Sequence, residues 1–388
     1  MMRYKLGEIF NLQMGKTPDR HSPKFWNEGT EPWISIADLT KCIKYIENTA
    51  EKITATAVDE SGIKIIPKNT VIMSFKLSIG KVAITPKEMY SNEAIMSFID
   101  KGVLKIEPVY LYYLLMHKDW DTDTNKAVMG KTLNKATLSQ MAVNIHGYSE
   151  QLEIIKALDT ASSIITARKQ QLAEWDNLIK ARFVEMFGDC VLNSKGWKTK
   201  RLGDIAEVGS SKRVFVEDLK ESGIPFYRGT EIGALAEGKT VTPELFISKE
   251  HYAELCIATG APNIGDLLMP SICPDGRIWV VNTEKPFYFK DGRVLWVHAI
   301  DDSYNPVFLL YTLKDRIMSD YSSIASGTTF AELKIFALKK CHVFDVPLEL
   351  QNQFAAFVNQ TDKSKVAVQK ALDEAQMLFD SLMQKYFG

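Results

Sequence analysis

The stretch Leu6-Gly7-Glu8-Ile9 returns as Leu202-Gly203-Asp204-Ile205, 196 positions later in the chain. Further stretches return in the same order: Met73-Ser74 as Met269-Pro270, Gly80-Lys81-Val82 as Gly276-Arg277-Ile278, Val109–Tyr113 as Val307–Tyr311, and Met186-Phe187-Gly188 as Tyr386-Phe387-Gly388. A spacing near 200 residues is too long for a solenoid repeat, so it predicts a duplicated domain with a trailing segment. Two similar but diverged modules indicate a protein that contacts its target twice, with different chemistry at each contact.

Length and composition predict a globular chain of two or three domains. With 388 residues, 46% hydrophobic and 24% charged, the chain can build a separate core in each domain. No apolar run approaches the roughly 18 residues that a membrane span needs. The first residues are not followed by an apolar stretch that resembles a signal peptide, so we expect no membrane contact. The five cysteines are scattered without a CxxC pair, which argues against zinc and disulfides and favours a cytoplasmic location.

Charge gives only local support to DNA binding. The whole chain has a net charge of −1. Residues 1–147 hold 19 Lys and Arg against 16 Asp and Glu, a net charge of +3, whereas residues 189–346 hold 19 against 21, a net charge of −2. A DNA-binding surface must therefore be a local basic patch.

Residues 1–147 have the pattern of a mixed domain of helices and strands, and residues 189–346 repeat it. Short apolar runs between Gly and Pro predict strands, and Pro108 and Pro306 each open a helix. The predicted strands are Val71–Met73 and Lys81–Ile84 in the first copy, and Asp266–Met269, Arg277–Val281 and Val294–Val297 in the second. The predicted fold class is therefore α/β (α+β), with two similar globular domains.

Two segments without Gly or Pro, residues 149–187 and 349–387, predict long helices. The apolar positions of the first follow a coiled-coil seam; they are Ile155, Leu158, Ile165, Leu172, Ile179, Phe183 and Met186. Ser149 is expected to cap this helix and Gly188 to end it. The seam of the second is interrupted at Asp362, Lys365 and Gln369.

Each long helix needs a partner for its apolar stripe. At 1.5 Å per residue, a helix of this length extends roughly 57 Å. We predict that the two helices pack antiparallel as a coiled-coil spacer, with the domains at its opposite ends and related by a pseudo-two-fold axis.

A series of motifs follows the repeat. In the first copy these are Leu6–Ile9, Gly15-Lys16-Thr17-Pro18, Pro32–Leu39, Ser78–Lys81, Gly130–Leu133 and Ser149-Glu150-Gln151. In the second they are Leu202–Ile205, Ile224–Gly229, Gly327–Phe330 and Pro347–Gln351, with Ser210–Arg213 replacing the Gly-Lys-Thr-Pro stretch. In order, spacing and duplication, the whole chain resembles the specificity (S) subunit of type I restriction-modification systems.

The resemblance implies a non-catalytic subunit that reads DNA. Residues 1–147 and 189–346 would be target-recognition domains, and residues 148–188 and 347–388 would be spacer helices. Each domain would read one half of an asymmetric bipartite site, while the helices would set the gap and dock methyltransferase subunits. The partners would be double-stranded DNA, two methyltransferase subunits and two restriction subunits.

Base recognition usually relies on Arg, Lys, Asn and Gln, with positioning contacts from Ser and Thr. The DNA-binding candidates are Lys16, Thr17, Lys76, Ser78, Lys81, Lys131 and Asn134 in the first domain, and Ser211, Lys212, Arg213, Arg228, Arg277, Arg293 and Thr328 in the second. Lys81 and Arg277 occupy equivalent repeat positions, which favours a shared phosphate-facing role. For any single candidate, a solvated surface side chain is the alternative. Core packing is the favoured role for Trp26, Trp33, Trp279 and Trp296.

No catalytic residue, metal ion or cofactor is predicted. Both Gly-Lys-Thr stretches lack the upstream Gly of a P-loop, and the six histidines have no metal-binding spacing. Asn305-Pro306-Val307 fails the Asn-Pro-Pro-aromatic pattern of adenine methyltransferases. Two alternatives remain open: a stand-alone DNA-modifying enzyme, and a protein-binding scaffold with duplicated domains.

Overall fold

The computed structural model describes residues 1–76, 78–120, 133–327 and 331–388. The chain divides into two units, the first formed by residues 1–170 and 369–388 and the second by residues 171–368. Each unit contains one copy of the repeated domain together with parts of both long helices, α7 (Tyr148–Phe187) and α13 (Leu348–Phe387).

The main sheet of each unit has four antiparallel strands in the same order. In the first unit the order is β2 (Phe10–Met14), β8 (Ile95–Asp100), β5 (Val71–Ser74) and β6 (Val82–Ile84). In the second it is β11 (Glu207–Gly209), β17 (Val294–His298), β14 (Leu267–Pro270) and β15 (Trp279–Val280). The predicted strands are confirmed, but the one expected at Arg277–Val281 is shorter, since only Trp279 and Val280 pair with β14.

A second sheet of three strands also recurs. Its central strand pairs antiparallel with one neighbour and parallel with the other. The orders are β4 (Glu51–Ile53), β3 (Glu31–Ile34), β7 (Tyr90–Ser91) and β13 (Phe246–Ile247), β12 (Ile224–Tyr227), β16 (Tyr288–Phe289). The register places Trp33 opposite Tyr90 and Phe226 opposite Tyr288. The two three-stranded sheets therefore match strand by strand.

Two-stranded sheets complete the strand pairing. The pairs are β1 (Met2–Lys5) with β9 (Ala142–Ile145), β10 (Thr199–Arg201) with β20 (His342–Phe344), and β18 (Ala325–Ser326) with β19 (Glu332–Leu333).

Shorter helices lie at matching places between the strands. Those of the first unit are α1 (Leu6–Ile9), α2 (Pro23–Trp26), α3 (Ile36–Lys41), α4 (Ala55–Ser61), α5 (Pro108–His117) and α6 (Lys135–Gln140). Those of the second are α8 (Leu202–Ile205), the 3₁₀ helix η1 (Val216–Asp218), α9 (Gly229–Ala236), α10 (Lys249–Thr259), α11 (Pro306–Ile324) and α12 (Ile335–Lys339). Pro108 and Pro306 take the first helical position of α5 and α11, as predicted.

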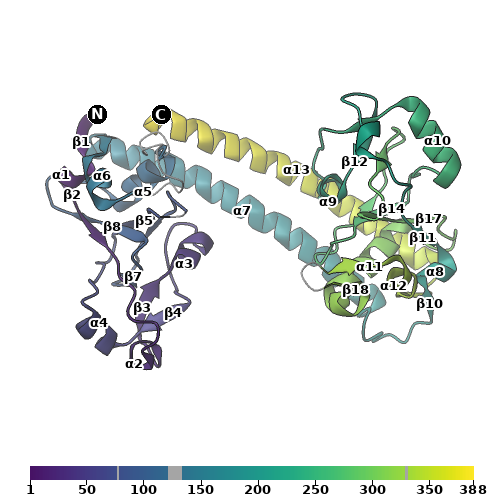
Figure 1. The fold of residues 1–388 in the computed structure, drawn as a ribbon, viewed down its shortest axis with the longest axis horizontal. Helices are drawn as coiled ribbons and strands as arrows, with labels where there is room; N and C mark the ends of the chain where they lie inside the picture. The colour runs from purple at the N-terminus through teal and green to yellow at the C-terminus, as the bar shows by residue number, and fades with distance from the viewer. Residues whose placement is uncertain (77, 121–132, 328–330) are drawn as a thin grey trace. The chain divides into compact units, whose positions relative to one another are not determined.

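The cores show that α7 and α13 run antiparallel. In the first unit, Leu158 near the start of α7 shares a core with Met383 near the end of α13. In the second, Phe183 near the end of α7 shares a core with Phe354 near the start of α13. These two contacts together require opposite directions, which confirms the predicted antiparallel pairing (Figure 1).

In the second unit, aromatic rings make the contacts among α7, α11 and α13. Phe183 and Phe187 of α7, Phe308 of α11 and Phe354 of α13 form one cluster. Their ring centroids lie between 4.8 and 6.0 Å apart. Edge-to-face and offset ring pairs of this kind stabilise a core beyond the area that they bury.

The predicted cap of the first long helix is wrong. Helix α7 already begins at Tyr148, so Ser149 lies inside its first turn. The carboxylate of Glu150 accepts the backbone N–H of Gly147 at 2.9 Å and takes the capping role instead. At the other end Gly188 has a φ of 84°, which confirms it as the residue that ends the helix.

The seam of α13 is more continuous than its sequence predicts. It passes through buried Thr361 and Val368, whereas Asp362 and Gln369 lie off it at exposed positions. Lys365 does lie in the seam, and its ammonium group pairs with Asp176 of α7 at 2.5 Å. Its methylene stem can cover the seam while the charge reaches the rim.

A buried glutamine anchors each long helix through the same three hydrogen bonds. Gln151 accepts the N–H of Glu107 at 3.0 Å and donates to the carbonyls of Lys105 and His146 at 3.2 and 3.1 Å. The corresponding partners of Gln351 are Asn305, Ser303 and Val346, at 2.8, 3.0 and 2.9 Å. One amide group thus satisfies a backbone donor and two backbone acceptors that are otherwise left unpaired in the interior.

Candidate nucleic-acid interface

The segment after β2 brings Lys16 and Thr17 to the surface. The Lys16 N–H donates to the Ser91 carbonyl of β7 at 2.8 Å, which fixes the backbone across the second sheet. A Cβ added to Gly15 would lie 2.2 Å from that carbonyl oxygen, so the position requires glycine. The Lys16 ammonium donates to the Ser61 carbonyl at 2.5 Å, and the Thr17 hydroxyl donates to the Glu93 carboxylate. The Gly-Lys-Thr stretch is therefore a tightly held turn.

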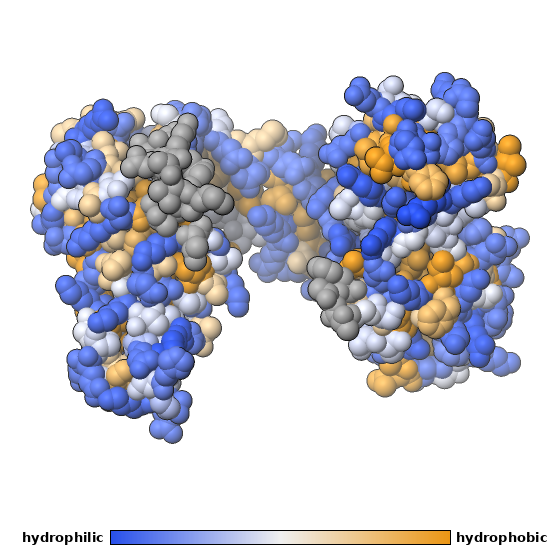
Figure 2. Space-filling view, viewed as in Figure 1, coloured by the Kyte–Doolittle hydropathy of each residue, from blue (hydrophilic) through white to orange (hydrophobic). Residues whose placement is uncertain are grey.

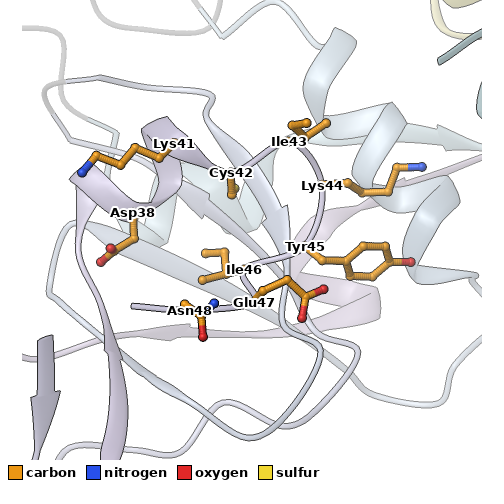
Figure 3. A pocket seen from close by; sticks show the side chains of 9 residues that line it. All are labelled: Asp38, Lys41, Cys42, Ile43, Lys44, Tyr45, Ile46, Glu47 and Asn48. Carbon is orange, nitrogen blue, oxygen red and sulfur yellow. The ribbon is translucent and has the colours of Figure 1, made fainter. Parts of the chain in front are cut away.

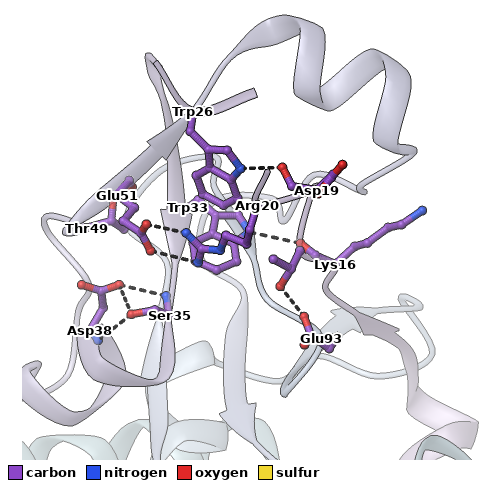
Figure 4. Close-up of polar contacts among 11 residues, drawn as sticks. Lys16, Asp19, Arg20, Trp26, Trp33, Ser35, Asp38, Thr49, Glu51 and Glu93 are labelled. Atoms are coloured by element: carbon purple, nitrogen blue, oxygen red, sulfur yellow. Dashed lines mark hydrogen bonds and ion pairs between the residues drawn. The ribbon is translucent and has the colours of Figure 1, made fainter. Parts of the chain in front are cut away.

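The same segment carries an arginine fixed on two indoles (Figure 4). The guanidinium carbon of Arg20 lies 3.9 Å from the ring centroid of Trp26 and 4.6 Å from that of Trp33. Each indole N–H donates to a carbonyl of this segment, Trp26 to Asp19 at 3.0 Å and Trp33 to Lys16 at 3.1 Å. Trp33 is buried, as predicted, while Trp26 is only partly so.

The loop between β5 and β6 carries Lys76, Ser78 and Lys81. Lys76 lies over the ring of Phe75, with its ammonium 5.4 Å from the centroid. The N–H of Ser78 donates to the Lys76 carbonyl at 2.8 Å, which makes Ser78 part of a tight turn. Lys81 reaches α3 and donates to the Thr40 hydroxyl at 2.5 Å.

The remaining candidates of the first domain are not brought into this group. Lys131 lies outside the described residues. The Asn134 side chain accepts the N–H of Thr137 at 2.9 Å and so caps α6. Its role in the structure is that of an N-cap, which lowers its availability to DNA bases.

The carboxylate of Glu93 lies near several of these side chains. The pKa of Glu93 is lowered, mainly by the hydrogen bond from Thr17, and also by the charges of Lys76 and Arg20. The structure thus places Lys16, Thr17, Lys76 and Arg20 on one part of the first domain. Arg20 was missed by the sequence analysis, and its signal was its position six residues before Trp26 in a segment rich in aromatic residues.

The equivalent segment of the second domain has different side chains in the same place. The Ser211 hydroxyl donates to the Phe289 carbonyl at 2.6 Å, on the strand that corresponds to β7. The N–H of Lys212 donates to the Tyr288 hydroxyl at 3.1 Å, and both side chains of Lys212 and Arg213 are exposed. The Arg213 guanidinium lies 5.6 Å from the ring centroid of Phe215.

Three predicted arginines of the second domain are held in ion pairs. Arg228 contacts Glu231 at 2.6 Å and Glu244 at 3.0 Å. Arg277 contacts Asp275 at 2.8 Å and Glu237 at 3.8 Å, and Arg293 pairs with Glu332. Thr328 lies outside the described residues. The three arginines are therefore oriented by carboxylates of their own domain.

Glu231 has a strongly shifted pKa. Partial burial opposes its ionisation, but hydrogen bonds from the side chain and backbone of Arg228 outweigh this and lower its pKa to about 2. Arg228 is therefore oriented at the start of α9, where it is the N-cap residue and Glu231 lies in the first turn. The shared role predicted for Lys81 and Arg277 stays a prediction, because one binds a hydroxyl and the other a carboxylate.

A pocket of about 470 Å³ lies along residues 41–48 of the first unit (Figure 3). Of the acidic groups that line it, Asp38 accepts the N–H and hydroxyl of Ser35 at 2.8 and 2.7 Å, and the N–H of Ala50 at 3.0 Å. Lys44 turns to α7, where it pairs with Asp159 at 2.5 Å. These side chains hold the loop in place, and their donors and acceptors are used in doing so.

The end of the first unit that carries α2 and α4 is mainly hydrophilic on the face in Figure 2.

In the part of the chain that the structure describes, no three His, Cys, Asp or Glu side chains lie together as a metal-binding cluster. Among the same residues, no helix combines the length and the apolar character of a membrane span.

Comparison with protein families identifies the class. The sequence model of the type I restriction modification DNA specificity domain matches residues 1–174 and 194–375, which is one match for each copy of the repeat. The chain belongs to this family. The predicted resemblance is thereby confirmed.

Individual relatives agree with this assignment. The chain is 26% identical to the type I restriction enzyme MjaIX specificity subunit of Methanocaldococcus jannaschii, over 98% of this chain and 91% of that protein. It is also 26% identical to the EcoR124I/EcoR124II specificity subunit of Escherichia coli, over 40% of this chain and 39% of that one. The fold is similar to that of the type I S subunit from M. genitalium, with a TM-score of 0.57, 14% identity, and coverage of 100% of this chain and 96% of that chain.

Proposed function

We propose that this chain is the DNA sequence-specificity subunit of a type I restriction-modification complex. Each target-recognition domain, residues 1–147 and 189–346, reads one half of an asymmetric bipartite DNA site. The observation that carries the proposal is the contrast between scaffold and surface. The two domains share every main strand order, yet the segments after β2 and β11 present different side chains. One scaffold with two different surfaces suits two different half-sites.

The spacer helices, residues 148–188 and 347–388, set the gap between the half-sites and dock methyltransferase subunits. Their antiparallel packing supports this role, since it leaves the outer faces for a partner. Lys169 and Lys180 of α7 are exposed there. Half-sites on the same side of DNA lie about one duplex turn, roughly 34–36 Å, apart, so lengthening both helices should change the gap and leave the half-sites unchanged.

The subunit acts without chemistry of its own and joins two methyltransferase and two restriction subunits on double-stranded DNA. The use of Asp38 and Glu150 as capping groups supports a structural role for these carboxylates. Purified chain incubated with DNA, Mg²⁺ and S-adenosylmethionine should neither cleave nor methylate the DNA. Turnover by the chain alone would favour the stand-alone enzyme.

The decisive experiment is co-expression with the modification subunit, followed by mapping of methylated adenines in the host DNA. A gapped two-part motif is expected. Replacing residues 1–147 by the corresponding domain of a relative should change one half of that motif and preserve the other half and the gap. A stable complex without any motif would instead favour a protein-binding scaffold.

A further inference from the structure

Arg20 is an exposed cation of the segment after β2 that two rings and a carboxylate hold in place. Its guanidinium is in contact with the faces of Trp26 and Trp33, at 3.9 and 4.6 Å from the two ring centroids. The two indoles meet edge to face at 5.2 Å and 89°, so together they form a corner around the guanidinium. Stacking of Arg on aromatic faces removes much of its rotational freedom, and Lys has no planar group that could replace it.

Glu51 fixes the remaining rotation of this group (Figure 4). Its carboxylate accepts from Nη1 of Arg20 at 2.5 Å and from Nη2 at 3.1 Å, which is a bidentate pair. A guanidinium has five N–H donors, and this pair uses two of them. The Nε–H and the outer hydrogen of Nη2 remain as a second donor edge, and the Arg20 side chain is 45% exposed.

Such a pair suits a base edge better than a phosphate. Guanine presents N7 and O6 as two acceptors in the major groove, which match a guanidinium edge, and its paired cytosine presents an amino group that a carboxylate can accept. A phosphate placed at the same edge would lie beside the negative charge of Glu51. Arg20 and Glu51 together thus have the donor and acceptor pattern of a G·C pair.

We propose that Arg20, oriented by Trp26, Trp33 and Glu51, reads a G·C base pair in the half-site of the first domain. This inference rests on the proposed function. It assigns a specificity-determining residue and its base. In the second domain the corresponding segment places Arg213 beside the single ring of Phe215, at 5.6 Å, so the two domains differ in how this position is built.

The test uses the full chain together with its modification subunit and a library of randomised duplex DNA. Bound duplexes are selected at fixed salt and sequenced, which gives the base preference at each position. The wild-type complex should select a bipartite motif with a G·C pair in one half. Arg20→Lys keeps the charge but lacks the fork, so it should lower the preference for that pair by about tenfold or more, with all other positions unchanged.

Two further variants make the result specific. Glu51→Gln should weaken the preference at the same position, because it loosens the arginine and removes the charge. Lys24→Gln is the matched control, since Lys24 lies in the same segment and pairs with Glu60 at 2.5 Å. It should leave the motif unchanged. If Arg20→Lys fails to keep the wild-type circular dichroism spectrum, Glu51→Gln decides the question.

The alternatives give separate outcomes. A motif that Arg20→Lys and Glu51→Gln leave unchanged overturns the role of Arg20 while the proposed function stands. A uniform loss of affinity for all sequences, with a shallower salt dependence in Arg20→Gln, identifies a phosphate contact and also overturns it. A wild-type complex that selects no motif rejects the proposed function, and this inference with it.

Discussion

The two copies of the repeated domain hold their arginines in different ways on one scaffold. In the first, Arg20 is stacked on Trp26 and Trp33, and paired with Glu51. In the second, Arg228, Arg277 and Arg293 are held by carboxylates. Since the strand orders are the same, the difference lies in the side chains that the connecting segments and strands carry, such as Trp33 of β3 and Glu51 of β4. Duplication has preserved the sheets, which carry the cores, and diversified the loops, which can change at little cost in stability.

The long helices differ in a similar way. At the positions that correspond in the repeat, α7 has Ile154 and Ile165 where α13 has Phe354 and Lys365. The difference between Ile154 and Phe354 lies at the domain cores, whereas the difference between Ile165 and Lys365 lies in the middle of the seam.

The largest effect is expected for Phe354→Ala. This ring is buried in the aromatic cluster of the second unit, so its removal should lower the free energy of unfolding by about 3–5 kcal/mol. Ile154→Ala, at the corresponding place in the first unit, should cost less, because a smaller side chain is removed. Urea denaturation of the full chain measures both. An equal or greater loss for Ile154→Ala would contradict the view that the second unit depends more on this contact.

Gln151→Leu and Gln351→Leu test what the copies share. Each change leaves buried backbone groups without a partner, so each should lower the free energy of unfolding by about 1–3 kcal/mol. The two losses should be similar, because the three hydrogen bonds are the same. Gln353→Leu, at an exposed position of α13, is the control and should have little effect. A large difference between the two glutamines would show that one helix is anchored by other contacts.

Lys365→Ile makes α13 resemble α7 at this position. The Asp176 side chain of the ion pair is largely exposed, so the pair contributes little to stability, and an apolar side chain fits the seam in place of Lys365. The change should alter the free energy of unfolding by less than about 1 kcal/mol, in the stabilising direction. Asp176→Ala should be mildly destabilising, because Lys365 then loses its partner. A clear loss of thermal stability in Lys365→Ile would show that the ion pair is needed for the register.

The smallest effect concerns pH. The folded pKa of Glu231 is about 2, against an ordinary value of 4.5. Its ionised form therefore stabilises the fold fully above about pH 4.5, and this contribution is lost as the pH falls towards 2. The difference in unfolding midpoint between the wild type and Glu231→Gln should shrink from pH 6 to pH 2.5. Glu93→Gln should show the same direction more weakly, since the pKa of Glu93 is also lowered. If the difference in unfolding midpoint between the wild type and Glu231→Gln stayed constant over this pH range, the ionisation of Glu231 would not be coupled to stability.

Much of the fold could be predicted from the repeat and the apolar pattern. The strands at Val71 and Val294, the helices opened by Pro108 and Pro306, and the antiparallel long helices all depend on local periodicity and on the need to cover an apolar stripe. The cap at Ser149 could not be placed correctly, because Ser and the nearby Glu150 are both good acceptors for an N-terminal N–H.

The candidate site could be predicted only in part. The Gly-Lys-Thr turn selected Lys16 and Thr17, and residue type selected Lys76; Thr17 and Lys76 both lie near Glu93. The same criterion selected Asn134, whose side chain caps a helix, and it passed over Arg20. Nothing in the order of residues states that Glu51 is the partner of Arg20, since the two are 31 positions apart.

The sequence by itself determined the duplicated architecture and the family, because repeated motifs and apolar periodicity are properties of neighbouring residues along the chain. Only the tertiary structure decided which cations are oriented, which are paired with carboxylates, and which glutamines hold the long helices. These properties depend on groups that folding brings together across the sheet and between elements. Their energies are set by distance and burial, neither of which the linear order of the residues contains.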